Sequence, residues 1–177
     1  MNFKSFTARL ALLVSCGLMT ATPAMAQFWQ CAPYARQISG IDIHGNANTW
    51  WGQAAGRYGR GHTPRVGAVL AFAANGHMPL GHVAMVSEVI SAREVLLTHA
   101  NWSRRGGVET NVRAVDVSEA GDWSRVKVWY GPVGGLGTSA YAAKGFIYAD
   151  RSQDEQAPLA PMTMASADTS NGDTAAF

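Results

Sequence analysis

The chain has 177 residues, 47% of them hydrophobic, so it is long and apolar enough for one domain with a packed core. Its charge divides unevenly, because residues 27–151 carry 12 basic and 8 acidic residues, whereas residues 152–177 carry 4 acidic and no basic ones. The net charge of +4 on the first part is too small to predict nucleic-acid binding, which uses clustered basic faces. It is compatible with an anionic polymer at a bacterial surface.

Residues 1–26 predict a secretory signal. Two basic residues precede an apolar stretch at residues 10–21, and Ala24-Met25-Ala26 is an A-x-A cleavage site. The apolar stretch is shorter than the roughly 20 residues of a membrane-spanning helix. A lipoprotein signal ending at Cys16 is the second choice, because the better cleavage site follows it. We expect an exported protein, periplasmic or extracellular, with no integral membrane segment in its mature chain.

Two short helices are expected at the start of the mature chain. Residues 31–39 form the first, and Gly40 ends it. Residues 46–55 form the second, with Asn46 as the N-cap. Residues 57–65 are rich in Gly and Arg and are expected to be a loop.

From residue 66 onward the sequence alternates and is rich in valine, as strands are. The predicted strands span residues 66–73, 81–89, 94–102, 108–117 and 125–130. A short turn between the second and third predicts a hairpin. Helices followed by a meander of strands indicate an α+β fold and not an alternating βαβ one.

The C-terminal part has a different composition. Residues 133–151 are predicted to be a linker, within which the apolar stretch 141–148 docks back on the domain. Residues 152–177 contain few large apolar side chains and are predicted to be a disordered acidic tail. The compact domain is therefore expected to span residues 27–132.

Cys31 is the cysteine that remains once the signal is removed. An exported protein cannot use a single cysteine for an internal disulfide, and a lone cysteine with histidines elsewhere is a candidate nucleophile. A helix N-terminus and a nearby imidazolium both lower the pKa of a thiol. The alternative is that Cys31 is a small buried hydrophobic residue.

His82 is the candidate partner of the thiol, because it opens a predicted strand at a loop edge. Its imidazole needs a third group to hold the ring. His99 and Asn101 lie two apart on the next predicted strand and therefore face the same side. Either residue can accept a hydrogen bond from His82 Nδ1–H, and the sequence leaves both open.

An oxyanion intermediate needs hydrogen-bond donors placed in advance. The backbone N–H of Cys31 is the first candidate, and the side chain of Gln30 or Tyr34 is the second. Trp102 flanks the proposed site and is a candidate for the wall of a substrate groove, although core packing explains it equally well.

A zinc site is the competing use of these side chains, since Cys and His are zinc ligands. The sequence contains no close ligand pair such as C-x-x-C or H-E-x-x-H among the candidates Cys31, His44, His62, His77, His82 and His99. We therefore expect neither a metal nor another cofactor.

Five motifs follow one another along residues 27–132: Gln30-Cys31, Gly45-Asn46-Ala47 with Trp50, Pro64-Arg65-Val66-Gly67-Ala68-Val69, Gly81-His82-Val83-Ala84-Met85-Val86, and Thr98-His99-Ala100-Asn101-Trp102. Their order and spacing resemble the CHAP domain, the cysteine, histidine-dependent amidohydrolases/peptidases, which are similar to NlpC-type cell-wall peptidases. The resemblance implies a papain-like α+β fold, in which N-terminal helices carrying the cysteine pack on a small antiparallel sheet or half-barrel.

By position, Cys31 resembles the family nucleophile, His82 the family base and Asn101 an asparagine that follows the third catalytic position. His99 occupies a position where CHAP domains commonly carry Glu, whereas NlpC-type enzymes often use His there. The resemblance implies hydrolysis of an amide in peptidoglycan, either between muramic acid and L-alanine or within the stem or cross-bridge peptides.

The sequence therefore predicts an exported monomeric cysteine amidohydrolase or endopeptidase that acts on peptidoglycan. Its expected mechanism pairs a Cys31 thiolate with protonated His82 and passes through an acyl-thioester. One alternative is a wall-binding or envelope interaction protein without hydrolytic activity. Another is an effector delivered into competitor cells, which an ordinary signal peptide disfavours.

Overall fold

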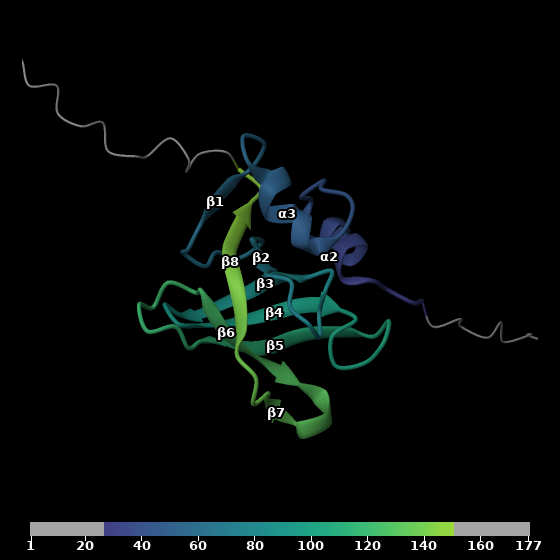
Figure 1. Cartoon of the computed structure of the whole chain (residues 1–177), viewed down its shortest axis with the longest axis vertical. Coiled ribbons are helices and arrows are strands. Elements are labelled where there is room, and N and C mark those ends of the chain that lie inside the picture. The colour runs from purple at the N-terminus through teal and green to yellow at the C-terminus, as the bar shows by residue number, and fades with distance from the viewer. Residues whose placement is uncertain (1–26, 151–177) are drawn as a thin grey trace, which may run out of the picture.

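The computed structural model describes residues 27–150 (Figure 1). The predicted signal at residues 1–26 and the predicted acidic tail at residues 152–177 lie outside the described residues. No helix within residues 27–150 is long and apolar enough to cross a membrane.

Both predicted helices are present at the N-terminal end of the described chain. Helix α2 spans Cys31–Ser39 and ends at Gly40, whose φ of 72° lets its N–H bond back to Arg36 O. Helix α3 spans Ala47–Ala54. Asn46 occupies its N-cap position, but the Asn46 side chain makes no capping hydrogen bond.

The five predicted strands are present, with ends that differ by up to three residues from those expected. Three further strands were not predicted. The strands are β1 (Gly59–Gly61), β2 (Val69–Phe72), β3 (His82–Ser91), β4 (Glu94–Ala100), β5 (Val108–Asp116), β6 (Arg125–Tyr130), β7 (Gly135–Leu136) and β8 (Tyr141–Tyr148). A 3₁₀ turn, η1, covers Gly131–Val133. The stretch 57–65 thus holds β1, which pairs with β8, and is not only loop.

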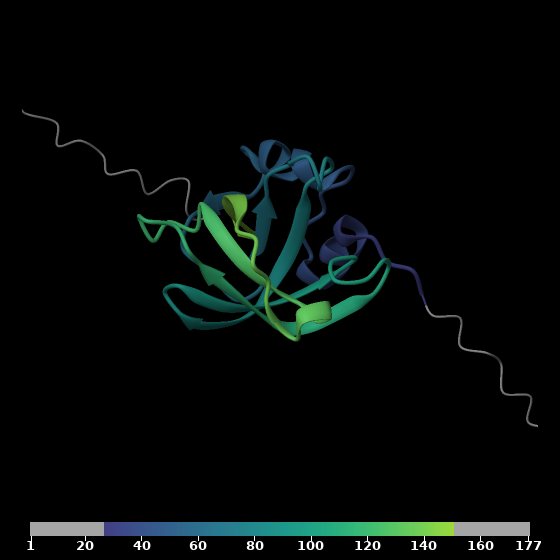
Figure 2. The same ribbon diagram turned by 60° about the horizontal axis from the view of Figure 1, so that its bottom comes forward.

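All strand pairs are antiparallel, in the order β1-β8-β2-β3-β4-β5-β6-β7. Strands β3 and β4 form the predicted hairpin. Strand β8 pairs with β2 along one edge and with β6 near its start, so the sheet closes on itself. Figure 1 shows β8 crossing the other strands, and Figure 2 shows the sheet curling beneath it. The sheet therefore extends beyond residue 132, where the sequence placed the end of the compact domain.

Strand β2 and the first part of β3 are buried on both faces of the sheet, and their alternate residues pack on opposite sides. One side packs Leu70 and Phe72 with Trp123 inside the curled sheet. The other packs Val69 and Val83 against α2 and α3, together with Ile41, Ile43, Trp50 and Ile147. The result is an α+β architecture in which two N-terminal helices cover one face of a small antiparallel sheet, as expected. The beginning of β3 lies where these two cores meet.

Candidate active site

Cys31 is the first residue of α2, and its side chain is partly buried against the start of β3. Helix α2 packs on β3 and β4, so its N-terminal end lies beside the strand that carries His82. The backbone of Val83 hydrogen-bonds to the Cys31 thiol. The first turn of a helix also presents backbone N–H groups without intrahelical partners. Local packing thus places the thiol between a helix N-terminus and the edge of the sheet.

Gly81 positions the adjacent His82, because it lets the backbone before β3 pass close to the backbone of α3. Its φ is +70°, and a Cβ at this position would lie 2.8 Å from Asn48 N, so only glycine fits without strain. The Asn48 backbone N–H donates to Leu80 O at 2.8 Å, which ties this turn to the first turn of α3. His82 follows at once as the first residue of β3 and points to the side opposite Val83.

His82 and His99 are in direct contact across the hairpin. His82 Nε2 and His99 Nδ1 are 2.9 Å apart, and both side chains are buried. The sequence predicted instead that His82 uses Nδ1 for its third group. Because Nε2 is engaged with His99, a contact between His82 and the thiol would have to use Nδ1.

Aromatic rings enclose the histidine pair. The Trp102 ring centroid lies 4.8 Å from that of His82 and 5.7 Å from that of His99. Phe72 packs 5.7 Å from His82, and Tyr141 packs 4.9 Å from Trp102. Trp102 also donates through Nε1 to Trp129 O at 2.9 Å. Trp102 therefore serves both as a wall beside His82 and as part of the core.

Asn101 contacts the segment before Cys31 and not His82. Strand β4 ends at Ala100, and Asn101 adopts a φ of 62°, which removes it from the alternation that the sequence predicted. Its Nδ2 donates to Gln30 Oε1 at 2.9 Å, and its Oδ1 accepts from Gly106 N at 2.8 Å. This arrangement leaves the amide N–H groups of Gln30, the residue that precedes Cys31, as donors at the mouth of the site.

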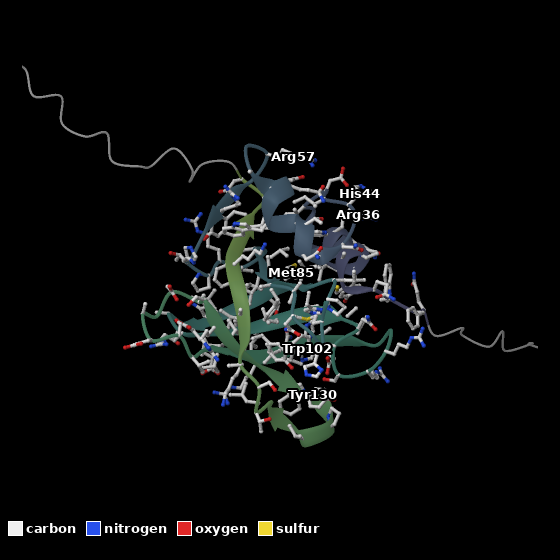
Figure 3. All side chains as sticks on the ribbon, in the orientation of Figure 1. Arg36, His44, Arg57, Met85, Trp102 and Tyr130 are labelled. Atoms are coloured by element: carbon white, nitrogen blue, oxygen red, sulfur yellow. The ribbon has the colours of Figure 1, made fainter. Side chains whose placement is uncertain are left out.

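An open cleft of about 790 Å³ brings these groups together. Its lining includes Cys31 and His82 with Gln30, Asn101, Trp102 and Tyr130. Figure 3 shows Trp102 and Tyr130 over the sheet, away from Arg36, His44 and Arg57 at the helical end, with Met85 between them. Among the described residues that line the cleft, none is Lys, Arg, Asp or Glu. The cleft therefore combines apolar, aromatic and neutral polar side chains, without a Lys, Arg, Asp or Glu among its described lining residues.

The pKa values of the two candidate reactive groups move toward their neutral forms. Burial raises the pKa of the Cys31 thiol, against the lowering effect of backbone hydrogen bonds from Val83, Ala32 and Cys31 itself. Burial, followed by the neighbouring His99, lowers the pKa of His82 well below its usual value. These directions favour a neutral thiol beside a neutral imidazole in the free protein, and not the thiolate–imidazolium pair expected from the sequence.

The remaining predicted site residues lie behind or beside the cleft. His99 is fully buried behind His82 and does not line the cleft. Tyr34 lies one turn along α2, outside the cleft lining, with its ring 5.4 Å from that of Trp29. The structure thus brings Gln30, Cys31, His82, Asn101 and Trp102 to one cleft.

Sequence analysis missed Glu109. Its Oε2 lies 3.4 Å from His99 Nε2, because Glu109 is the cross-strand partner of His99 between β4 and β5. The expected antiparallel pairing of these strands was the available signal. It did not identify the pair, because the register shifts between Leu97 and His99.

No group of three or more His, Cys, Asp or Glu side chains within residues 27–150 is arranged to hold a metal ion. Of the other histidines considered as ligands, His44 contacts Asp42 and His62 donates from Nδ1 to Asp122 O. His77 lies at the rim of the cleft.

Comparison with known families gives one match, in which residues 22–101 match the model of the CHAP domain. The matched segment is a CHAP domain. Such domains are cysteine- and histidine-dependent amidohydrolases or peptidases, which supports an enzyme of this general class. The CHAP match includes α2, α3 and the β3–β4 hairpin, whereas β5 to β8 and Glu109 lie beyond it. No curated protein matches the chain.

Proposed function

We propose that this CHAP domain belongs to an exported cysteine amidohydrolase or endopeptidase that cleaves an amide bond in bacterial peptidoglycan. The observation that carries the proposal is the shared cleft of Cys31 and His82, within the part of the chain that matches CHAP. A helix N-terminus beside the thiol and a second histidine behind His82 support it, because catalysis by a cysteine uses an activated thiol, a base and a third group that orients the base.

The proposed reaction begins with a neutral pair. As Cys31 Sγ bonds to the carbonyl carbon, the thiol proton passes to His82 Nδ1 and the carbonyl oxygen becomes an oxyanion. The backbone N–H of Cys31 and the side-chain amide of Gln30 donate to that oxygen. His82 then protonates the departing amine as the C–N bond breaks, which leaves an acyl-thioester.

Water completes the cycle. His82 removes a proton from the water as its oxygen adds to the thioester carbonyl, and the C–S bond then breaks. The products are a carboxylic acid and the restored Cys31 thiol. General acid–base catalysis of this kind contributes roughly 10²–10⁴-fold to a rate.

The uncharged cleft favours one class of bond within peptidoglycan. Stem peptides carry free carboxylates beside several of their peptide bonds, and a carboxylate placed in a cleft without a cationic partner loses hydration. The amide between the lactyl group of muramic acid and L-alanine is flanked by uncharged groups. We therefore infer that the muramoyl–L-alanine bond is the preferred substrate, with Trp102 and Tyr130 beside the sugar.

The rival function is wall binding without hydrolysis, which the aromatic cleft would also serve. Binding does not require a thiol beside an imidazole whose ring is held by another side chain. Hydrolysis therefore explains more of the observed geometry than binding does.

Digestion of purified peptidoglycan tests the function directly. We expect the mature protein under reducing conditions to release soluble fragments, and Cys31→Ala to release none. Mass spectrometry should find intact stem peptides with a free N-terminal alanine if the muramoyl–L-alanine bond is cut. Fragments cut within the stem would contradict the bond assignment but support the hydrolase.

The variant Tyr34→Phe is a matched control, because Tyr34 lies on α2 near Cys31 but does not line the cleft. We expect it to retain activity. Hydrolysis by Cys31→Ala, or no hydrolysis by a folded and reduced wild type, would contradict the proposed function.

A further inference from the structure

His99 Nε2 is buried and forms no hydrogen bond of normal geometry within the described part of the chain. A buried polar atom without a hydrogen-bond partner costs free energy, so the nearest charged neighbour of His99 Nε2 is important. That neighbour is Glu109, whose Oε2 lies 3.4 Å away, as an ion-pair contact longer than a normal hydrogen bond. His99 Nδ1, on the other side of the ring, contacts His82 Nε2 at 2.9 Å. His99 therefore bridges His82 and Glu109.

The Glu109 carboxylate is held in place and ionised. Its Oε2 accepts a hydrogen bond from Ser103 N at 3.1 Å, and its side chain is only 14% exposed. Burial raises the pKa of Glu109, but the close contact with His99 and the hydrogen bonds from Ser103 outweigh this effect and lower the pKa to about 2. At neutral pH this group can therefore only accept hydrogen bonds.

Because Glu109 can only accept hydrogen bonds, it determines which ring nitrogen carries the proton in His99 and, through His99, in His82. A His99 ring that carries a single proton places it on Nε2, which faces Glu109, so its Nδ1 is an acceptor. His82 must then donate from Nε2–H, which leaves His82 Nδ1 without a proton. The opposite order would set the lone pair of His99 Nε2 against a carboxylate in a buried site. The favoured order makes His82 Nδ1 the basic nitrogen.

We propose that Glu109 is a positioning residue that sets the tautomers of His99 and His82, and thereby presents the unprotonated Nδ1 of His82 to Cys31. Glu109 acts through His99 and does not line the cleft. The effect on hydrolysis rests on the proposed function, whereas the tautomers do not.

The first test is ¹⁵N NMR of the histidine rings in the wild-type protein near pH 8, above the ordinary histidine pKa of about 6.5. Both His82 and His99 should show the Nε2–H tautomer, with His82 Nδ1 unprotonated. A protonated His99, or the Nδ1–H tautomer of either residue, would overturn the inference. This measurement needs no substrate and no variant.

The second test compares Glu109→Ala with Glu109→Gln. The contacts with His99 Nε2 and Ser103 N both fall on Oε2 of Glu109, so the carbonyl oxygen of Gln can accept from these two groups in its place. We expect the Ala variant to populate mixed tautomers and the Gln variant to keep the wild-type order. Glu94→Ala is the matched control, since it removes a glutamate that pairs with Arg113 farther along the same β4–β5 strand pair, and it should leave both histidines unchanged. Wild-type tautomers in a folded Glu109→Ala protein would refute the role.

Kinetics on peptidoglycan fragments give a separate readout. Glu109→Ala should lower kcat by about 10–100-fold, less than complete loss of a general base, while KM stays within about 2-fold. Glu109→Gln should recover most of the lost kcat. A rise in KM with kcat unchanged would contradict a positioning role. If the NMR result holds and the wild type digests nothing, the proposed function fails and the proton order stands.

Discussion

At the scale of single residues, the ionisation of Cys31 separates two mechanisms. Burial raises the pKa of the thiol and lowers that of His82, so we expect a neutral pair before substrate binds. Cys31 is the single cysteine of residues 27–177, so alkylation by iodoacetamide reports on it alone. Since the thiolate is the reactive form, the rate should reach its plateau only above pH 9, the ordinary value for the thiol being 9.0.

The control for this measurement is His82→Ala. For a neutral pair, removal of the imidazole leaves the alkylation profile in the same alkaline range. A thiolate–imidazolium pair would instead give the wild type a plateau at pH 5–7, which His82→Ala would abolish. That outcome would contradict the directions found for both pKa values.

At the scale of elements, the turn before β3 decides whether His82 reaches the cleft. We expect Gly81→Ala to destabilise the fold by at least about 2 kcal/mol, because a positive φ and a clash with backbone both oppose a side chain there. Activity should fall as well, since relief of the clash would displace residue 81 and, with it, the adjacent His82. Urea unfolding and peptidoglycan digestion measure the two effects.

Gly76→Ala is the matched control in the same connection between β2 and β3. Its φ is not positive, and no atom lies within 4 Å of a Cβ built there. Its stability should change by less than about 0.5 kcal/mol. Equal stability of the Gly76 and Gly81 variants would show that the approach to Asn48 does not constrain this turn.

At the scale of the whole molecule, β8 makes the sheet one cooperative unit. Its Phe146 and Ile147 are fully buried in the two separate cores, and the strand pairs with β1, β2 and β6. A chain of residues 27–132 lacks this strand and should show no cooperative urea transition. A chain of residues 27–151 should unfold cooperatively and digest peptidoglycan as the mature protein does. Cooperative unfolding of the shorter chain would contradict a closing role for β8.

Much of the fold and site follows from patterns that act over a few residues. Helix α2 and strand β6 were predicted with the bounds that the structure has, because capping and alternation are local properties. The CHAP resemblance, carried by short motifs around Cys31, His82 and His99, agrees with the family match. Asn101 differs, since one residue of positive φ at the strand end turned its side chain from the histidines to Gln30.

The tertiary structure alone decided the contacts made between distant segments. The pairing of His99 with Glu109 depends on a register shift in the β4–β5 ladder, and a one-residue slip would send Glu109 to the other face. The role of β8 likewise depends on partners more than 60 residues away. The sequence by itself thus predicted the candidate reactive groups, Cys31, His82 and His99, and the resemblance to CHAP. In the proton order that we propose, packing and strand register determine which ring nitrogen of His82 lacks a proton, because they place the Glu109 carboxylate beside His99 and His99 beside His82.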